Sequence, residues 1–260
     1  MNDKEHLMYE IMGRISASDA PIVFKGAMVT KLILAENSFT AFERQTNDVD
    51  ANWVGTPPSM DALVGTINSA LEEMTEQLYA TAFRDYADRK SAGISIRRKG
   101  ADDELFVMDI SMKPVNDDRL YYFGEIVVKG VLANEILFDK IAVMSTRLIF
   151  RRAKDMFDVY ALAQCVQIDT QEIIKTHQAN PNREVGAFDE FYNRQSDLEH
   201  AYNKLAGIKN KPPFSDVYTY LTDFIKPFSE KDMKLRTWNN EKRRWDNKAP
   251  EKKPAIHDKR

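Results

Sequence analysis

The apolar pattern of this 260-residue chain changes its period near residue 130. Before that point, several segments alternate polar and apolar residues, which is the period of a half-buried β-strand. From residue 134 onward, apolar residues recur at helical spacing instead. The sequence therefore predicts an α+β N-terminal half that is joined near residue 130 to an all-helical C-terminal half.

The first half contains both predicted helices and predicted strands. Apolar residues at helical spacing predict helices over residues 3–17, 28–35 and 60–86. Short apolar or alternating runs predict strands over residues 22–24, 48–54, 94–99, 105–113 and 121–129. The third and fourth of these strands flank a polar turn, so we expect them to pair as a hairpin.

The second half contains helical patterns that are separated by prolines and polar segments. The predicted helices cover residues 134–149, 154–166, 170–178, 186–206 and 215–227. We therefore expect three parts in the chain. These are an α/β core over residues 1–130, a helical domain over residues 131–230 and a basic tail over residues 231–260.

The composition excludes several classes of protein. With 43% hydrophobic residues, the chain has enough apolar side chains for a core, which excludes disorder for most of it. It has no run of about 18 apolar residues, and its first residues lack an apolar segment, so we expect neither a membrane span nor a secretory signal. A single cysteine, Cys165, excludes an internal disulfide framework and favours a cytoplasmic protein.

The formal net charge of −3 conceals an uneven distribution. Residues 231–260 carry 11 Lys+Arg and 5 Asp+Glu, a local charge of +6, which leaves 26 basic and 35 acidic residues, or −9, elsewhere. A basic segment attracts phosphates or an acidic partner, although a solvated terminus has the same composition. On a helix, Trp238 and Trp245 would share one side, where they would stack on single-stranded RNA or dock on the acidic body; we favour docking.

Two carboxylates, Asp48 and Asp50, begin one of the predicted strands. Residues two apart on a strand point to the same face, and two adjacent carboxylates repel each other unless a cation lies between them. Oxygen ligands at this spacing suit Mg²⁺ or Mn²⁺. The motif is short, and a pair of exposed acids at the edge of a strand would have the same sequence pattern.

Asp109 is a third candidate ligand, because it interrupts the apolar strand pattern LFVMDISM. A carboxylate in apolar surroundings needs a partner, since burying an unpaired charge is costly. If Asp109 meets the Asp48/Asp50 pair, the three form a metal triad. Alternatively, Asp109 is a core residue held by backbone N–H groups or by an arginine.

Two further regions suggest binding to an anion. Lys25 and Gly26 follow a short strand and precede a helix, whose N-terminus would suit a phosphate, although an ordinary strand-to-helix turn has the same pattern. In the second half, Lys140 and Arg147 fall on one predicted helical face, and acids lie among apolar residues of the next helix, at Asp155 and Asp158. These charges indicate either a cleft or a structural salt-bridge network between two helices.

Five segments together resemble the AbiEii/AbiGii-type nucleotidyltransferases, which are toxins of type IV toxin–antitoxin and phage-abortive systems. In family order, the segments are IVFKGAM (22–28), RQTNDVDANW (44–53), FVMDIS (106–111), NEILFDKIAVMSTR (134–147) and KDMFDVYAL (154–162). The ordered set R-x-T-x-D-x-D, K-x6-R and K-D-x-x-D is more specific than any single segment.

The resemblance implies a DNA polymerase β-like fold, with a mixed sheet, flanking helices and a C-terminal helical bundle. It also implies metal-dependent transfer of a nucleoside monophosphate from an NTP. Asp48, Asp50 and Asp109 would hold Mg²⁺ (or Mn²⁺), and Asp109 would also help to deprotonate the attacking hydroxyl. Lys140 would contact the triphosphate, and Asp155 or Asp158 would complete the site. The other nucleotide-binding residues would be Lys25, Gly26, Thr30, Arg44 and Arg147.

Three functions remain open on the sequence. The first is an active toxin that modifies an RNA (tRNA ends being the first candidate) or a protein hydroxyl, and that has a cognate antitoxin of winged-helix type. The second is a degenerate module that binds nucleotide, RNA or antitoxin without catalysis. It is suggested by Ala27 and Met28, where the superfamily usually has a second glycine and then Ser or Thr. The third, a phosphohydrolase or nuclease, is least favoured because the histidines are scattered.

Overall fold

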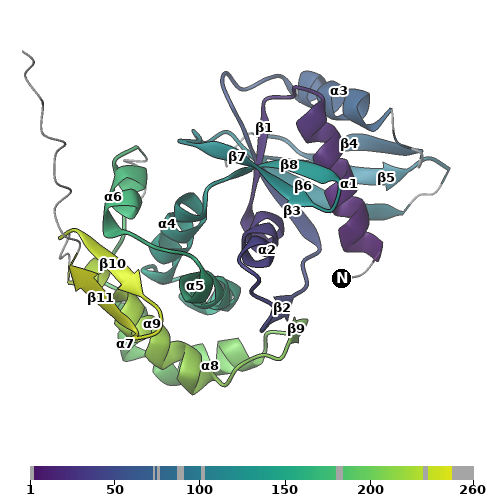
Figure 1. The fold of residues 1–260 in the computed structure, drawn as a ribbon. Helices are drawn as coiled ribbons and strands as arrows, with labels where there is room; N and C mark the ends of the chain where they lie inside the picture. Colours follow the sequence, from purple (N-terminus) through teal and green to yellow (C-terminus); the bar gives the residue numbers. More distant parts are fainter. Residues whose placement is uncertain are drawn as a thin grey trace, which may run out of the picture.

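A mixed β-sheet organises the N-terminal half of the computed structural model (Figure 1). The structure describes residues 3–72, 74, 77–86, 91–100, 103–179, 184–230 and 234–247. Within them, seven strands pair in the order β4-β5-β6-β3-β1-β8-β7. In chain order these are β1 (Ile22–Lys25), β3 (Asp48–Trp53), β4 (Leu78–Arg84), β5 (Ser91–Arg98), β6 (Glu104–Ser111), β7 (Asp118–Phe123) and β8 (Ile126–Val131).

One face of this sheet is covered by helices α1 (Asp3–Ala17), α2 (Gly26–Glu36) and α3 (Met60–Leu71). Ile126 of β8 packs against Gly13 of α1, and Gly130, on the same face of β8, lies against Val29 of α2. The tyrosine hydroxyl of Tyr9 joins the two helices by donating to the Met28 carbonyl at 3.0 Å. Helices on a single face leave the other face of the sheet free to form a site.

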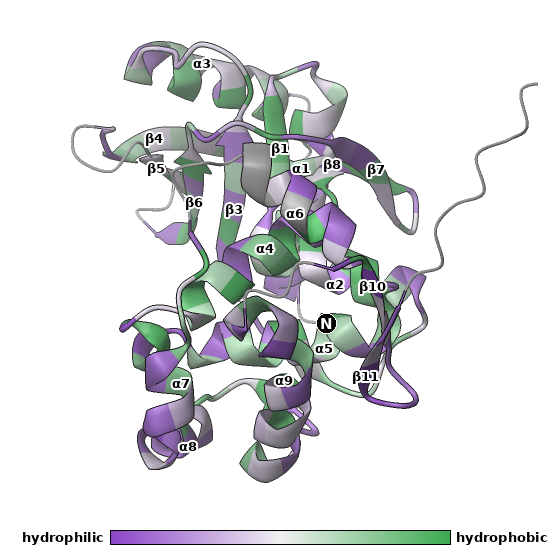
Figure 2. Cartoon of the chain, turned by 90° about the vertical axis from the view of Figure 1, so that its left-hand side faces the viewer, coloured by the Kyte–Doolittle hydropathy of each residue, from purple (hydrophilic) through white to green (hydrophobic). Residues whose placement is uncertain are grey.

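The open face is polar in the centre of the sheet. On β3 and β6 fully buried and partly exposed residues alternate, as expected for a sheet that is packed on one side only. Apart from Asn52, the buried positions are apolar, and the partly exposed ones include all three candidate carboxylates, Asp48, Asp50 and Asp109. Figure 2 shows β3 as mainly hydrophilic although it lies between two other strands.

The C-terminal half is mostly helical and packs beneath the open face (Figure 1). Helix α4 packs against α5 and α6, and α5 packs against α9. The two-residue strand β2 (Glu43–Arg44) pairs with β9 (Ile208–Lys209) and connects the halves. The helical elements are α4 (Ala133–Met144), η1 (Ile149–Arg151), α5 (Ala153–Cys165), α6 (Thr170–Ala179), α7 (Asp189–Asn193), α8 (Gln195–Asn203) and α9 (Phe214–Ser229).

The predicted α+β class is confirmed, but several local predictions are wrong. The helix expected over residues 60–86 ends at Leu71, and β4 follows from Leu78. Asn68 joins the two elements, because its side-chain amide donates to the carbonyl of Ala80 and accepts from the N–H of Ala80. Residues 78–84 pair with β5 as a strand, although their apolar residues continue the helical spacing of α3. The strand expected over residues 121–129 is a hairpin of β7 and β8, and the helix expected over residues 186–206 is split into α7 and α8.

The predicted basic tail contains a second β-hairpin rather than a helix. Strands β10 (Arg236–Asn239) and β11 (Arg244–Asn247) pair, so that Trp238 and Trp245 face each other across the hairpin. The indole N–H of Trp238 donates to the Ala163 carbonyl at 3.1 Å, and that of Trp245 donates to the Phe224 carbonyl at 2.8 Å. The expectation of docked tryptophans is thus confirmed in a different secondary structure. Residues 231–233 and 248–260 of the tail lie outside the described residues.

The described part of the chain has no helix that is both long and apolar enough to cross a bilayer.

Replacing Trp238 with alanine should lower the free energy of unfolding by about 3 kcal/mol, because loss of the buried indole leaves a cavity and removes its hydrogen bonds to the Ala163 carbonyl and the Tyr220 hydroxyl. Trp238 is 4% exposed, whereas nearby Leu235 is 47% exposed. Urea denaturation measures both variants, and Leu235→Ala serves as the control, with an expected cost below about 1 kcal/mol. A loss below about 1 kcal/mol for Trp238→Ala would contradict the described packing of the hairpin.

Candidate active site

A row of charged residues crosses the open face of the sheet. Lys25 of β1 lies opposite Asp50 of β3 in an antiparallel pair, and Asp50 lies opposite Asp109 of β6 in a parallel pair. Asp48 is two residues before Asp50 on the same face, and the hydroxyl of Thr46 donates to its Oδ1 at 2.7 Å. The sheet register therefore brings together the two acidic segments that the sequence separates by nearly sixty residues.

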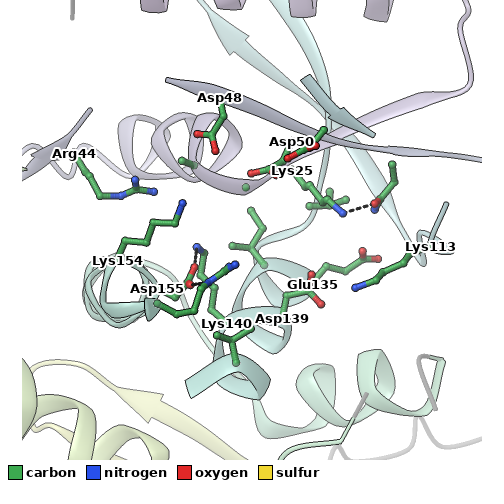
Figure 3. Close-up of a pocket in the computed structure, with 18 residues that line it drawn as sticks. Lys25, Arg44, Asp48, Asp50, Lys113, Glu135, Asp139, Lys140, Lys154 and Asp155 are labelled. Atoms are coloured by element: carbon green, nitrogen blue, oxygen red, sulfur yellow. Dashed lines mark hydrogen bonds and ion pairs between the residues drawn. The ribbon is translucent and has the colours of Figure 1, made fainter. Parts of the chain in front are cut away.

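These residues line a cavity of about 300 Å³ between the sheet and the helices (Figure 3). The sheet contributes Lys25, Asp50 and Asp109 to the cavity. The helical half contributes a face of α4 and the first residues of α5. The side chains of this half that line the cavity include Glu135, Ile136, Asp139, Lys140, Val143, Arg152, Lys154 and Asp155. Both halves are therefore needed to form the site.

The carboxylate pair has an electrostatic strain that favours binding of a cation. Burial, and then the charge of Asp48, raise the pKa of Asp50 above its ordinary value. Lys25, Lys140 and Lys154 oppose this rise without cancelling it. A cation between the two carboxylates would remove the repulsion.

Gly26 fits closely against one of these carboxylates. It begins α2 with a φ of +69°, and a Cβ at this position would lie 2.2 Å from the Oδ2 of Asp50. The N-cap residue Lys25 makes no side-chain capping hydrogen bond, so the first N–H groups of α2 are not capped by it. The glycine therefore places the positive end of a helix directly beside Asp50.

A buried ionic network forms the wall of the cavity on the helical side. Lys140 Nζ lies 2.8 Å from Asp155 Oδ1 and 2.6 Å from Asp158 Oδ2. Arg44 holds Asp158 with two hydrogen bonds, from Nε and Nη2, each 2.9 Å long. The Nε of Arg152 donates to Asp155 at 2.5 Å. The salt-bridge network that the sequence left open is therefore present, and it also faces the cavity.

The charges of this network stabilise one another. Burial alone would lower the pKa of Lys140, but Asp158 and Asp155 outweigh it and raise this pKa above the ordinary value. Burial alone would raise the pKa of Asp155, but Lys140 and Arg152 lower it to about 2. Burial likewise opposes the fall in the pKa of Asp158, and Lys140 and Arg44 overcome it. All of these groups are thus ionised at neutral pH.

Most of the residues proposed from the sequence meet at the cavity, but three do not line it. Asp158 is buried behind it in the ionic network. Thr30 is 3% exposed, and its hydroxyl donates to the Gly26 carbonyl at 2.9 Å, within α2. Arg147 is exposed, because α4 ends at Met144 and not at residue 149 as expected. The expectation that Lys140 and Arg147 share a helical face is therefore wrong.

Asp109 differs from the expectation of a carboxylate in apolar surroundings. Its side chain is 43% exposed, and its Oδ1 accepts from Nη2 of Arg84 at 2.5 Å. Of the two alternatives for Asp109, the structure shows an arginine partner. Within the described ranges, no three acidic, histidine or cysteine side chains converge as they stand into a group that could hold a metal ion.

Several residues of the site were not among the catalytic and nucleotide-binding residues proposed from the sequence. Lys154 precedes Asp155 in the KDMFD segment, and Arg152 lies three residues before Asp155, where the sequence offered both only as ion-pair partners of the acids. Asp139 precedes Lys140 on α4. Figure 3 shows Lys154 and Arg44 toward one end of the cavity and Lys113, Glu135 and Asp139 toward the other. Arg84 could not be placed at the site from the sequence, because residues 60–86 were expected to be helical.

A comparison with protein-family models matches residues 10–249 to the family described as "Nucleotidyl transferase AbiEii toxin, Type IV TA system". The chain belongs to this AbiEii family. The match covers both halves and the hairpin, so it extends well beyond the segments from which the resemblance was recognised. Membership identifies the chain as a nucleotidyltransferase of the toxin type and confirms the prediction made from the ordered motifs.

Two solved structures share the fold of this AbiEii family member. JHP933 from Helicobacter pylori is 15% identical, has a TM-score of 0.54, and aligns over 89% of this chain and 96% of its own. MenT4, a nucleotidyltransferase toxin from Mycobacterium tuberculosis H37Rv, is 15% identical, has a TM-score of 0.56, and aligns over 83% of this chain and 79% of its own. A search of curated proteins finds no match. At such low identity, the likeness concerns the fold alone.

Replacing Gly26 with alanine should reduce nucleotide transfer at least 100-fold, because the new Cβ displaces Asp50 from its position. The matched control is Gly100→Ala, which also has a positive φ, +81°, but has open space around it. Both variants should lose about 1 kcal/mol of stability from the backbone conformation. Labelled-NTP transfer and urea denaturation separate the two effects, and equal activities of the two variants would disprove the role of Gly26.

Replacing Asp155 with asparagine should alter how stability depends on pH. The folded-state pKa of Asp155 is about 2, below its value in the unfolded chain, so its ionised form stabilises the protein above about pH 4. The wild type loses this contribution, roughly 2 kcal/mol, as the pH falls toward 2, and the variant has none to lose. Urea denaturation at several pH values measures the difference, with Asp61→Asn on the exposed side of α3 as the control. A pH-independent difference between wild type and Asp155→Asn would refute this.

Proposed function

We propose that this AbiEii family member is a metal-dependent nucleotidyltransferase that moves a nucleoside monophosphate from an NTP to a hydroxyl of RNA, with tRNA as the first candidate. The observation that carries the proposal is the registered row of Lys25, Asp50 and Asp109, with Asp48 beside it, at the N-terminus of α2. Carboxylates suit divalent cations, and helix N-termini suit phosphates. Their adjacency suits a metal-bound triphosphate.

The donor set fits Mg²⁺ or Mn²⁺. Asp48 and Asp50 lie on one face of β3, where burial and then repulsion by Asp48 raise the pKa of Asp50, and a divalent ion would relieve the repulsion. Asp109 is beside Asp50 in the register and would complete the set after leaving Arg84. When bound, the metal would neutralise charge on the phosphates and align the reacting groups.

The chain's own residues would bind the triphosphate and accept a proton. The N-terminus of α2 and Lys25 would bind phosphate oxygens, and Lys154 and Arg152 at the cavity wall would add positive charge. The acceptor oxygen forms a bond to the α-phosphorus, the bond between this phosphorus and the bridging oxygen breaks, and pyrophosphate leaves. Asp109 accepts the proton of the attacking hydroxyl.

Charge distribution supports RNA rather than a protein as the acceptor. Three consecutive basic residues, Lys242 and Arg243 in the turn after β10 and Arg244 at the start of β11, lie on a protein that is acidic elsewhere. Clustered cations bind a phosphate backbone, which every RNA carries, whereas a protein acceptor would need an acidic surface to be attracted in the same way. We further propose that the toxin acts in a toxin–antitoxin or phage-defence pair with an antitoxin of winged-helix type, for which an adjacent gene encoding such a regulator would be the first sign.

A second candidate is a transferase fold that binds nucleotide, RNA or antitoxin without catalysis. Two observations favour it. Ala27, which stands where the superfamily usually has a second glycine, lines the cavity, and Met28, which stands where a hydroxyl residue is usual, is buried. Asp109 is paired with Arg84 instead of converging on Asp48 and Asp50. Mg²⁺-dependent incorporation of labelled nucleotide would exclude this candidate.

Replacing Asp50 with asparagine should abolish NTP-dependent labelling of RNA and any growth inhibition, because the carboxylate pair is lost. The assay is a screen of four labelled NTPs against total tRNA, analysed for added nucleotide. Asp61→Asn, an exposed substitution on α3, should keep full activity. Unchanged labelling by Asp50→Asn, or cleaved RNA in place of extended RNA, would refute the proposed function.

A further inference from the structure

Arg84 reaches the site across two strands of the sheet. It lies on β4 opposite Gly93 of β5, and Gly93 lies opposite Asp109 of β6. Because Gly93 has no side chain, the arginine can extend over it to Asp109, where Nη2 and Oδ1 are 2.5 Å apart. A Cβ at position 93 would lie 3.3 Å from the Cβ of Arg84, so a larger residue would crowd this path.

A β-bulge directs Arg84 onto this face. The register of β4 and β5 shifts between Ala82 and Arg84, which inserts Phe83 as an extra residue. Without the shift, Phe83 would lie opposite Gly93. Bulges beside active sites commonly re-aim one side chain in this way. The row of charges is thereby extended from Lys25, Asp50 and Asp109 to a fourth member.

Two buried polar atoms near the end of β4 have no hydrogen-bond partner among the described residues. They are the Nε of Arg84 and the hydroxyl of Tyr86, two residues further along the chain. Buried polar atoms are normally satisfied, so an unsatisfied pair indicates a missing ligand or an alternative conformation. Both groups donate hydrogen bonds, which suits an anionic ligand.

We propose that Arg84 binds a phosphate of the RNA acceptor, and that it is held by Asp109 until a divalent metal takes this carboxylate. The proposal rests on the proposed function. Asp109 has Asp50 on one side, where the metal and triphosphate would lie, and Gly93 and Arg84 on the other. The attacking hydroxyl approaches Asp109 from the side away from the triphosphate, which is the side of Arg84. Loss of the ion pair then leaves the guanidinium free beside the acceptor.

The first test measures Mn²⁺ binding to the full chain without nucleotide. Arg84→Gln should bind Mn²⁺ about tenfold more tightly than wild type, because Asp109 no longer has a competing counterion. Arg98→Gln, an exposed substitution on β5, is the control and should leave the affinity unchanged. Electron paramagnetic resonance of free Mn²⁺ provides the measurement and needs no catalytic turnover.

The second test measures binding of total tRNA at constant ionic strength, with Mg²⁺ and with EDTA. In Mg²⁺, Arg84→Gln should bind about tenfold more weakly than wild type, and its salt dependence should fall by about one phosphate contact. In EDTA the two proteins should bind alike, because Asp109 holds Arg84. Arg84→Lys keeps the charge and should restore most of the affinity in Mg²⁺.

The outcomes separate this proposal from the function on which it rests. A wild type that binds no Mn²⁺ and labels no RNA refutes the proposed function and the role of Arg84 with it. If the wild type binds Mn²⁺ and labels RNA, the proposed function stands. Equal Mn²⁺ affinity and equal tRNA affinity of Arg84→Gln and wild type would then refute the role of Arg84 alone. Labelling of a protein instead of RNA, with tRNA binding unaffected by Arg84→Gln, also refutes it.

Discussion

The two halves of the molecule depend on charges that cannot be buried singly. Lys140 on α4 and Asp158 on α5 are almost completely enclosed, and Arg44 brings the short strand β2 to the same point. Removing a buried ion from its partners leaves an uncompensated charge and costs several kcal/mol, so the three elements must come together in one arrangement. That arrangement sets the distance between the helices and the open face of the sheet, and the cavity is the space left between them.

The site combines features that are unfavourable when each is considered alone. A central strand carries two like charges, a helix begins in a left-handed backbone conformation, and a bulge interrupts a regular hairpin. The strand and the bulge place Asp50 and Arg84 on one transverse line of the sheet, and the helix begins directly beside Asp50. Because the opposite face is packed by three helices, the fold can tolerate polar residues at the centre of the open face. One face of the sheet thus packs against helices and stabilises the fold, and the opposite face carries the charged residues of the site.

Most residues of the site could be predicted from the sequence, but few of the contacts between them could. Asp48, Asp50 and Gly26 were found because strand periodicity and a glycine turn are local signals. The contact between Asp109 and Arg84 was not found, because it depends on the register of strands β4, β5 and β6, and residues 60–86 have the spacing of a helix. Trp238 and Trp245 fit both a helix and a hairpin at their spacing, and only the packing on α9 decides between them.

The hairpin β10–β11 also affects when the molecule becomes complete during synthesis. The carbonyls of Ala163 and Gln164, at the end of α5, are bonded by Trp238 and Asn240, which the ribosome adds after every residue that lines the cavity. A nascent chain that already contains all the charged groups of the cavity therefore still lacks the contacts that fix the end of α5. In chain order, the contacts that fix the end of α5 are thus the last to become available, after every side chain of the cavity has been made.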